Sequence, residues 1–123
     1  MKTVHTTNAP EAIGPYSQAM IAGGLVFTSG QIAINPASGA VEATTIEEQT
    51  EQVCRNIAAV LEAAGSSIDK VVKTTCFLQS MDDFATFNAV YGKYFTGKPA
   101  RSCVAVKTLP KNVLVEVDTI AEQ

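Results

Sequence analysis

The stretch VVKTTCFL at residues 71–78 decides the fold, because it has the composition of a strand and is flanked by a helical pattern on each side. Its β-branched residues favour extended structure. Upstream, Thr45 and Glu48 have capping-box spacing, so a helix should begin there, and Gly65 is a natural residue to end it. The buried face of this helix should carry the apolar residues at helical spacing, namely Val53, Ile57, Val60, Leu61 and Ala64.

A second helix is expected directly after the strand. Ser80 and Asp83 have the spacing of a helix start, and Gly97 with Pro99 should stop the helix. Aromatic residues at helical spacing usually indicate packing, so they are assigned to the buried side: Phe84, Phe87, Tyr91, Tyr94 and Phe95.

The remaining strands are predicted as hairpins. Residues 19–22 and 25–29 lie on either side of Gly23-Gly24, which suits a tight hairpin turn. An extended start at residues 3–5 leads into a loop, residues 35–40 read as a turn, and residues 100–107 and 113–121 are predicted as a closing hairpin around LPKN. We therefore expect one domain over residues 1–123, of the α+β class, with two helices on one face of a sheet.

Composition narrows the possible functions. The net charge is -3 and the basic residues are scattered, which argues against a nucleic-acid-binding surface. Apolar stretches are too short to cross a bilayer, and the N-terminus lacks the apolar core of a signal peptide, so no membrane partner and a cytoplasmic location are expected. Only 17% of residues are charged, which suggests that part of the surface is covered by another subunit.

Metal and disulfide chemistry find little support in the sequence. The three cysteines are widely spaced, which fits reduced thiols: Cys54, Cys76 and Cys103. The single histidine, His5, has no partner at ligand spacing, so neither a metal nor another cofactor is predicted.

The predicted closing hairpin gives the first indication of a site. If its turn pairs Leu109 with Asn112, then Arg101 and Cys103 share a face with Glu116 and Asp118. The alternative interpretation of this arrangement is an ordinary solvated ion pair between Arg101 and Asp118 on an edge strand. The helices can cover only one face of the sheet, so we expect another sheet to cover the opposite face.

Six stretches in order along the chain form a recognisable combination. They are IGPYSQA at 13–19, FTSGQI at 27–32, VVKTTCFL at 71–78, DFATFNAVYGKYF at 83–95, PARSCVAVKTLP at 99–110 and VEV at 115–117. Together they resemble the RidA (YjgF-type) family. The combination is much more specific than any single short motif.

The resemblance implies a chorismate-mutase-like subunit in a homotrimer, with a central β-barrel and active sites in the clefts between subunits. It implies hydrolysis of 2-aminoacrylate, 2-aminocrotonate and their imino tautomers, 2-iminopropanoate and 2-iminobutanoate, to 2-oxo acids and ammonia. The enamines would come from pyridoxal-phosphate-dependent serine and threonine dehydratases, so the activity would be a detoxification. By motif, the site residues are Tyr16, Ser29, Asn88, Arg101, Cys103 and Glu116. Gly30 is added as a substrate-binding candidate, because a glycine permits close approach of the backbone to a ligand.

Elementary chemistry is consistent with three of these assignments. A guanidinium grips a carboxylate through two parallel hydrogen bonds, which suits Arg101 as the substrate anchor. Glu116 is the candidate to orient a water and move its proton. Without an internal histidine to form a thiolate, Cys103 is expected to contact substrate through its main chain more than its sulfur.

Two other functions stay open at this stage. One is a regulatory trimer that binds a 2-oxo acid through Arg101 without turnover, and the other is an RNA-directed ribonuclease or translation inhibitor. The connection at residues 96–98 is shorter than the resemblance leads us to expect, so its effect on the pocket beside Arg101 is an open question.

Overall fold

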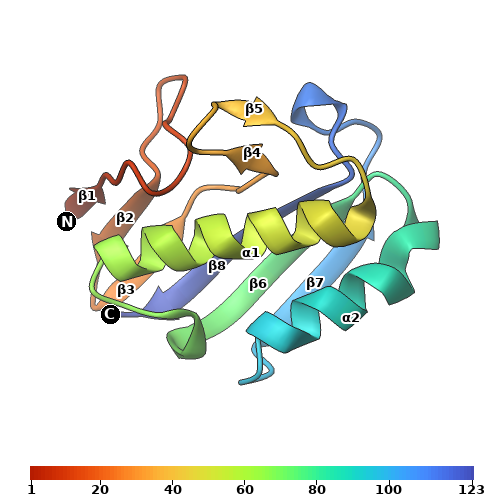
Figure 1. Cartoon of the computed structure of the whole chain (residues 1–123). Helices are drawn as coiled ribbons and strands as arrows, with labels where there is room; N and C mark the ends of the chain where they lie inside the picture. Colours follow the sequence, from red (N-terminus) through yellow and green to blue (C-terminus); the bar gives the residue numbers. More distant parts are fainter.

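The computed structural model describes all 123 residues and has two α-helices packed on one face of a six-stranded sheet (Figure 1). The strand order is β1-β2-β3-β8-β6-β7, and a separate two-stranded sheet pairs β4 with β5. The bounds of the strands are β1 Lys2–Val4, β2 Ala19–Ala22, β3 Leu25–Thr28, β4 Ile34–Asn35, β5 Ala40–Val41, β6 Val71–Leu78, β7 Ala100–Ala105 and β8 Val115–Glu122. The helices are α1 Ile46–Ala63 and α2 Phe84–Tyr94, with short 3₁₀ turns at Ile68–Lys70, Met81–Asp83 and Pro110–Asn112.

Both helices are present as predicted, but only α1 begins with the predicted cap. Ser80 instead caps the 3₁₀ turn before α2 by accepting from the Asp82 N–H, and Asp83, the residue before α2, makes no capping hydrogen bond with its side chain. The Thr45 side chain accepts a hydrogen bond from the Glu48 main-chain N–H, which satisfies one of the free donors at the start of α1. Gly65 follows the helix with φ 79, a conformation that glycine adopts without strain. The five residues of the predicted α1 stripe are all buried. Phe87 and Tyr91 on α2 are buried, as is Phe95 directly after the helix, while Phe84 and Tyr94 are half-buried.

The first hairpin is also confirmed, with β2 and β3 joined through Gly23 at φ 59 and Gly24 at φ 76. Positive φ at both central residues matches the twist of the flanking strands. The predicted turn at residues 35–40 is part of a slightly larger unit, because Ile34–Asn35 and Ala40–Val41 pair as a minimal hairpin.

The predicted closing hairpin is wrong. β7 does not pair with β8; it pairs in parallel with β6 at the edge of the sheet, and α2 is the crossover between these two strands. β8 instead lies between β3 and β6 and is antiparallel to both. The physical reason is burial, because β8 is fully buried on one face at alternate residues and occupies the centre of the sheet, while β7 has mostly exposed residues.

Alternation along β8 separates the two faces of the sheet. Val115, Val117 and Ala121 face the helices and are fully buried in the core. Glu116 and Asp118 point to the opposite face, which no helix covers, and neighbouring exposed side chains there include Phe27 and Val104. Neither α1 nor α2 is long and apolar enough to span a membrane.

Candidate functional site

The sheet register places Arg101 and Glu116 on opposite faces of the sheet. Arg101 aligns with Thr74 of β6, whose buried side chain faces the helices. Glu116 aligns with Phe77, which faces the other way. The prediction that Arg101 and Cys103 share a face with Glu116 and Asp118 is therefore wrong, because it depended on the closing hairpin. The alternative Arg101–Asp118 ion pair does not form either, since the only ion pairs involve other residues.

Arg101 is held on the helix side of β7 by α2. Its Nη1 donates to Asn88 Oδ1 at 2.7 Å, and its Cζ lies 4.9 Å from the centroid of the Tyr91 ring and 5.4 Å from that of Phe84. Contacts of this kind attract a cation to the faces of aromatic rings. Tyr91 is itself fixed by a 2.8 Å hydrogen bond between its hydroxyl and Thr74 Oγ1. The guanidinium is thus oriented and half-buried, and no carboxylate neutralises it.

Cys103 is two residues after Arg101 on β7, so it lies on the same face of the sheet, and it pairs with Cys76 of β6. Both thiols are free, and burial is the main cause that raises the pKa of Cys103, although the Arg101 charge opposes the shift. A raised pKa keeps the sulfur protonated near neutral pH and makes it a poor nucleophile. This agrees with the view that any role of Cys103 comes from its main chain.

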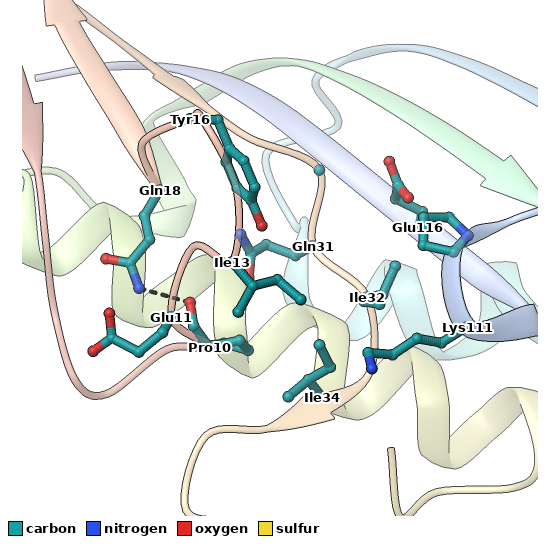
Figure 2. A pocket seen from close by; sticks show the side chains of 12 residues that line it. Pro10, Glu11, Ile13, Tyr16, Gln18, Gln31, Ile32, Ile34, Lys111 and Glu116 are labelled. Atoms are coloured by element: carbon teal, nitrogen blue, oxygen red, sulfur yellow. Dashed lines mark hydrogen bonds between the residues drawn. The ribbon is translucent and has the colours of Figure 1, made fainter. Parts of the chain in front are cut away.

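Glu116 and Tyr16 line a second region, a pocket of about 360 Å³ (Figure 2). Gly30 borders the Glu116 carboxylate so closely that a Cβ at residue 30 would lie 2.8 Å from Glu116 Cδ. Burial, followed by the like charge of Asp118, raises the pKa of Glu116. A carboxylate with a raised pKa exchanges protons closer to neutral pH, which is the property required of a general acid or base.

Ser29 takes part in a local loop contact. Its Oγ donates to the Ser17 carbonyl at 2.6 Å, and its main-chain N–H donates to the Gln18 carbonyl at 2.9 Å. These bonds tie the end of β3 to the loop that carries Tyr16. The hydroxyl oxygen keeps lone pairs with which it can accept a further hydrogen bond.

Gln18 lines the same pocket as Glu116 and Tyr16, and the sequence-based reasoning did not single it out. It is buried, its Nε2 donates to the Pro10 carbonyl at 2.7 Å, and its Oε1 accepts from the Thr6 N–H at 2.8 Å. Figure 2 shows it on the same loop as Tyr16, with the Pro10 contact drawn. Gln18 therefore fixes the loop that presents Tyr16 to the pocket. The signal was available, because Gln18 belongs to the quoted motif IGPYSQA.

The described chain thus carries two half-sites. One contains Arg101, Asn88 and Cys103 on the helix side of the edge strand, and the other contains Tyr16, Gly30 and Glu116 on the other side of the sheet. One can bind an anion and the other can handle a proton, but they lie apart within one chain.

Residues 6–123 match the family model described as Endoribonuclease L-PSP. A curated relative from Lactococcus lactis, named as the regulator AldR, is 54% identical and is aligned over 99% of this chain and 98% of its own length. The 2-iminobutanoate/2-iminopropanoate deaminase of Salmonella typhimurium is 48% identical over 98% of this chain and 96% of its own. The crystal structure of the Escherichia coli YjgF gene product superposes with a TM-score of 0.95 at 45% identity, covering 100% of this chain and 99% of that one.

Proposed function

Because the chain belongs to the Endoribonuclease L-PSP family, the RidA or YjgF-type family, we propose that it hydrolyses short 2-imino acids to 2-oxo acids and ammonia. The observation that carries the proposal is the oriented, half-buried Arg101 guanidinium with no carboxylate partner. Its fork geometry suits the carboxylate that every 2-imino acid carries. The enamine tautomers, 2-aminoacrylate and 2-aminocrotonate, would enter the same site.

Glu116 is the proposed proton-transfer residue. In the reaction, water adds to the imine carbon, the C–N bond breaks, and the nitrogen leaves as ammonia. Glu116 would take a proton from the attacking water and give it to the nitrogen. It would then take the proton of the new hydroxyl as the C=O bond forms and give it to the nitrogen that leaves, a task that its raised pKa favours. Tyr16, Ser29 and the Gly30 main chain would position the substrate on this side. No covalent intermediate with the protein is required.

The separation of Arg101 and Glu116 supports an active site between two copies of the chain. An Arg101 half-site at the β7 edge of one protomer would face the Glu116 half-site of the next, and the uncovered sheet face would be buried against the neighbouring sheets. A closed homotrimer with a central β-barrel, as the family resemblance implies, satisfies both requirements. This arrangement gives Asn88 and Cys103 to the subunit that supplies Arg101.

The proposed partners are small imino and 2-oxo acids, and the proposed source of substrate is a pyridoxal-phosphate-dependent serine or threonine dehydratase. Free enamines and imines are reactive, so faster hydrolysis would protect other proteins. The protein itself needs no cofactor for this chemistry, since water and a carboxylate are sufficient.

A dehydratase-coupled assay tests the proposal. The dehydratase generates 2-aminoacrylate or 2-aminocrotonate in place, semicarbazide traps the surviving imine, and release of 2-oxo acid is followed. Wild-type protein should outcompete the trap, whereas Arg101→Ala and Arg101→Lys should lose at least about tenfold in kcat/KM, because lysine keeps the charge without the fork. Arg55→Lys, on the exposed side of α1, is the matched control. A wild-type kcat/KM for Arg101→Lys would contradict the anchor role.

A regulatory function is the second candidate, favoured by the name of the Lactococcus lactis relative. A regulator would bind a 2-oxo acid through Arg101 without turnover. The same experiment separates the two functions, because a regulator leaves the release of 2-oxo acid unchanged while calorimetry still detects 2-oxobutanoate binding that Arg101→Ala abolishes. The ribonuclease function named in the family description would instead require RNA cleavage that copurifies with the protein and disappears in Arg101→Ala.

A further inference from the structure

The short connection between α2 and β7 brings a second cation to the Arg101 region. α2 ends at Tyr94 and β7 begins at Ala100, so few residues join the helix to the strand. Lys98 lies in this connection with φ 51, and its N–H donates to the Phe95 carbonyl at 3.2 Å. A left-handed conformation at a residue with a Cβ costs about 1 kcal/mol. Lys98 therefore keeps this conformation because the short turn requires it, against its own backbone preference.

Lys98 and Arg101 line the same surface pocket, which has a volume of about 340 Å³. The pocket lies on the helix side of the sheet, and the rings of Tyr91 and Phe95 form its apolar wall. These rings stack with their centroids 4.4 Å apart. It is distinct from the pocket that contains Glu116, since the two have no lining residue in common.

The charge of this pocket is unbalanced. It is lined by two cations and by no aspartate or glutamate, although the whole chain has a net charge of -3. Neither Lys98 nor Arg101 forms a salt bridge. Two neighbouring cations repel each other and favour the binding of an anion that can contact both.

We propose that Lys98 is a specificity residue that binds a second carboxylate, so that this chain prefers 2-imino and 2-oxo acids with a carboxylate at each end. This inference rests on one part of the proposed function: Arg101 binds the carboxylate next to the imine or keto carbon. Lys98 then binds the distal carboxylate, and the methylene groups between them lie against Tyr91 and Phe95. The long, flexible lysine stem lets the ammonium follow ligands of four or five carbons.

Calorimetry with two ligands of equal length tests this proposal without requiring turnover. 2-Oxoglutarate and 2-oxopentanoate have the same five-carbon chain. 2-Oxoglutarate ends in a second carboxylate, whereas 2-oxopentanoate ends in a methyl group. Wild-type protein should bind 2-oxoglutarate about tenfold tighter, because one charge-assisted hydrogen bond at a partly exposed site contributes roughly this much. The preference should weaken as salt is added, since the contact is electrostatic.

Three variants assign the preference to Lys98. Lys98→Met removes the charge but keeps the length of the side chain, and the ratio of the two Kd values should fall to near one. Lys98→Arg keeps a cation and should retain the preference. Lys107→Met changes the net charge equally at an exposed residue outside both pockets, and should behave as wild type. Equal ratios in wild type and Lys98→Met, or a wild-type ratio of one, would overturn the inference.

The outcomes also separate this inference from the proposed function. If imines are hydrolysed but the wild type shows no preference, only the role of Lys98 is wrong. If the Lys98-dependent preference is found without any hydrolysis, the Lys98 subsite is supported and the proposed deaminase function is wrong. If neither 2-oxo acid binds, the Arg101 anchor and the Lys98 subsite are both wrong.

Discussion

At the scale of single residues, Gly30 sets the position of the Glu116 carboxylate. A Cβ at residue 30 would lie 2.8 Å from Glu116 Cδ, closer than real Cβ atoms approach, so the glutamate must move. Gly30 does not have a positive φ, which means that alanine adds no backbone strain there. Gly30→Ala should therefore lower kcat by about ten- to a hundredfold while KM changes little, because a misplaced proton-transfer group affects the chemical step and the Arg101 anchor stays intact.

A double-variant cycle controls for other effects of this substitution. If Gly30→Ala acts through Glu116 alone, adding it to Glu116→Gln should cost no further activity. Equal losses in the two backgrounds would mean that Gly30 acts independently of Glu116.

The pair Glu116 and Asp118 predicts a pH effect whose direction is fixed by charge. Burial is the larger cause of the raised pKa of Glu116, and Asp118 on the same face is the second. A general base acts when it is ionised, so activity should rise with pH as Glu116 loses its proton. Asp118→Asn removes the like charge, stabilises the ionised form of Glu116, and should move the acidic limb of kcat/KM to lower pH.

In Asp118→Asn, Glu116 is still buried, and burial is the larger cause of its raised pKa. The acidic limb of kcat/KM should therefore stay above the pH at which a free glutamate titrates. Asp82→Asn, at an exposed residue before α2, is the control and should leave the limb in place. An unchanged or upward-shifted limb in Asp118→Asn would exclude Glu116 as the group that titrates.

At the scale of elements, local signals predicted the helices correctly and the last strand pairing incorrectly. The α1 boundaries followed from Thr45 and Gly65, because a cap depends on residues a few positions apart. The pairing of β7 depends on long-range contacts, and the LPKN turn signal suggested a hairpin between strands that are not neighbours. The overlooked signal was the strand-helix-strand order across residues 71–105, which is the usual pattern of a parallel pair.

The same distinction explains what was predictable about the candidate site. Tyr16, Arg101 and Glu116 were found by motif, since each belongs to a short local stretch. Their grouping was not found, because the face on which a strand residue lies is fixed by register with its neighbours. Because β7 pairs with β6 and not, as predicted, with β8, Arg101 and Glu116 lie on opposite faces of the sheet.

At the scale of the whole molecule, one chain has an uncovered sheet face and carries Arg101 and Glu116 on opposite faces of the sheet, and both features lead to the same expectation of assembly. Exposed Phe27 and Val104 lie on strands of that face, and β7 leaves one of its edges unpaired. A monomer with such a surface would expose apolar side chains and free main-chain groups to other chains. Association that covers the face also offers a second copy to complete each site.

Complementation between two inactive variants tests whether the sites are shared. Arg101→Ala keeps Glu116, and Glu116→Gln keeps Arg101, so each variant alone should be inactive. If the protein forms the proposed homotrimer, mixing equal amounts of both variants gives mixed trimers at random. A cleft in them is intact when an Arg101-bearing protomer precedes a Glu116-bearing one, which should restore about a quarter of wild-type activity. Each variant refolded alone is the control. If native mass spectrometry detects mixed trimers and they remain inactive, then Arg101 and Glu116 do not act across a subunit boundary, and the half-sites must be brought together by a change within one chain.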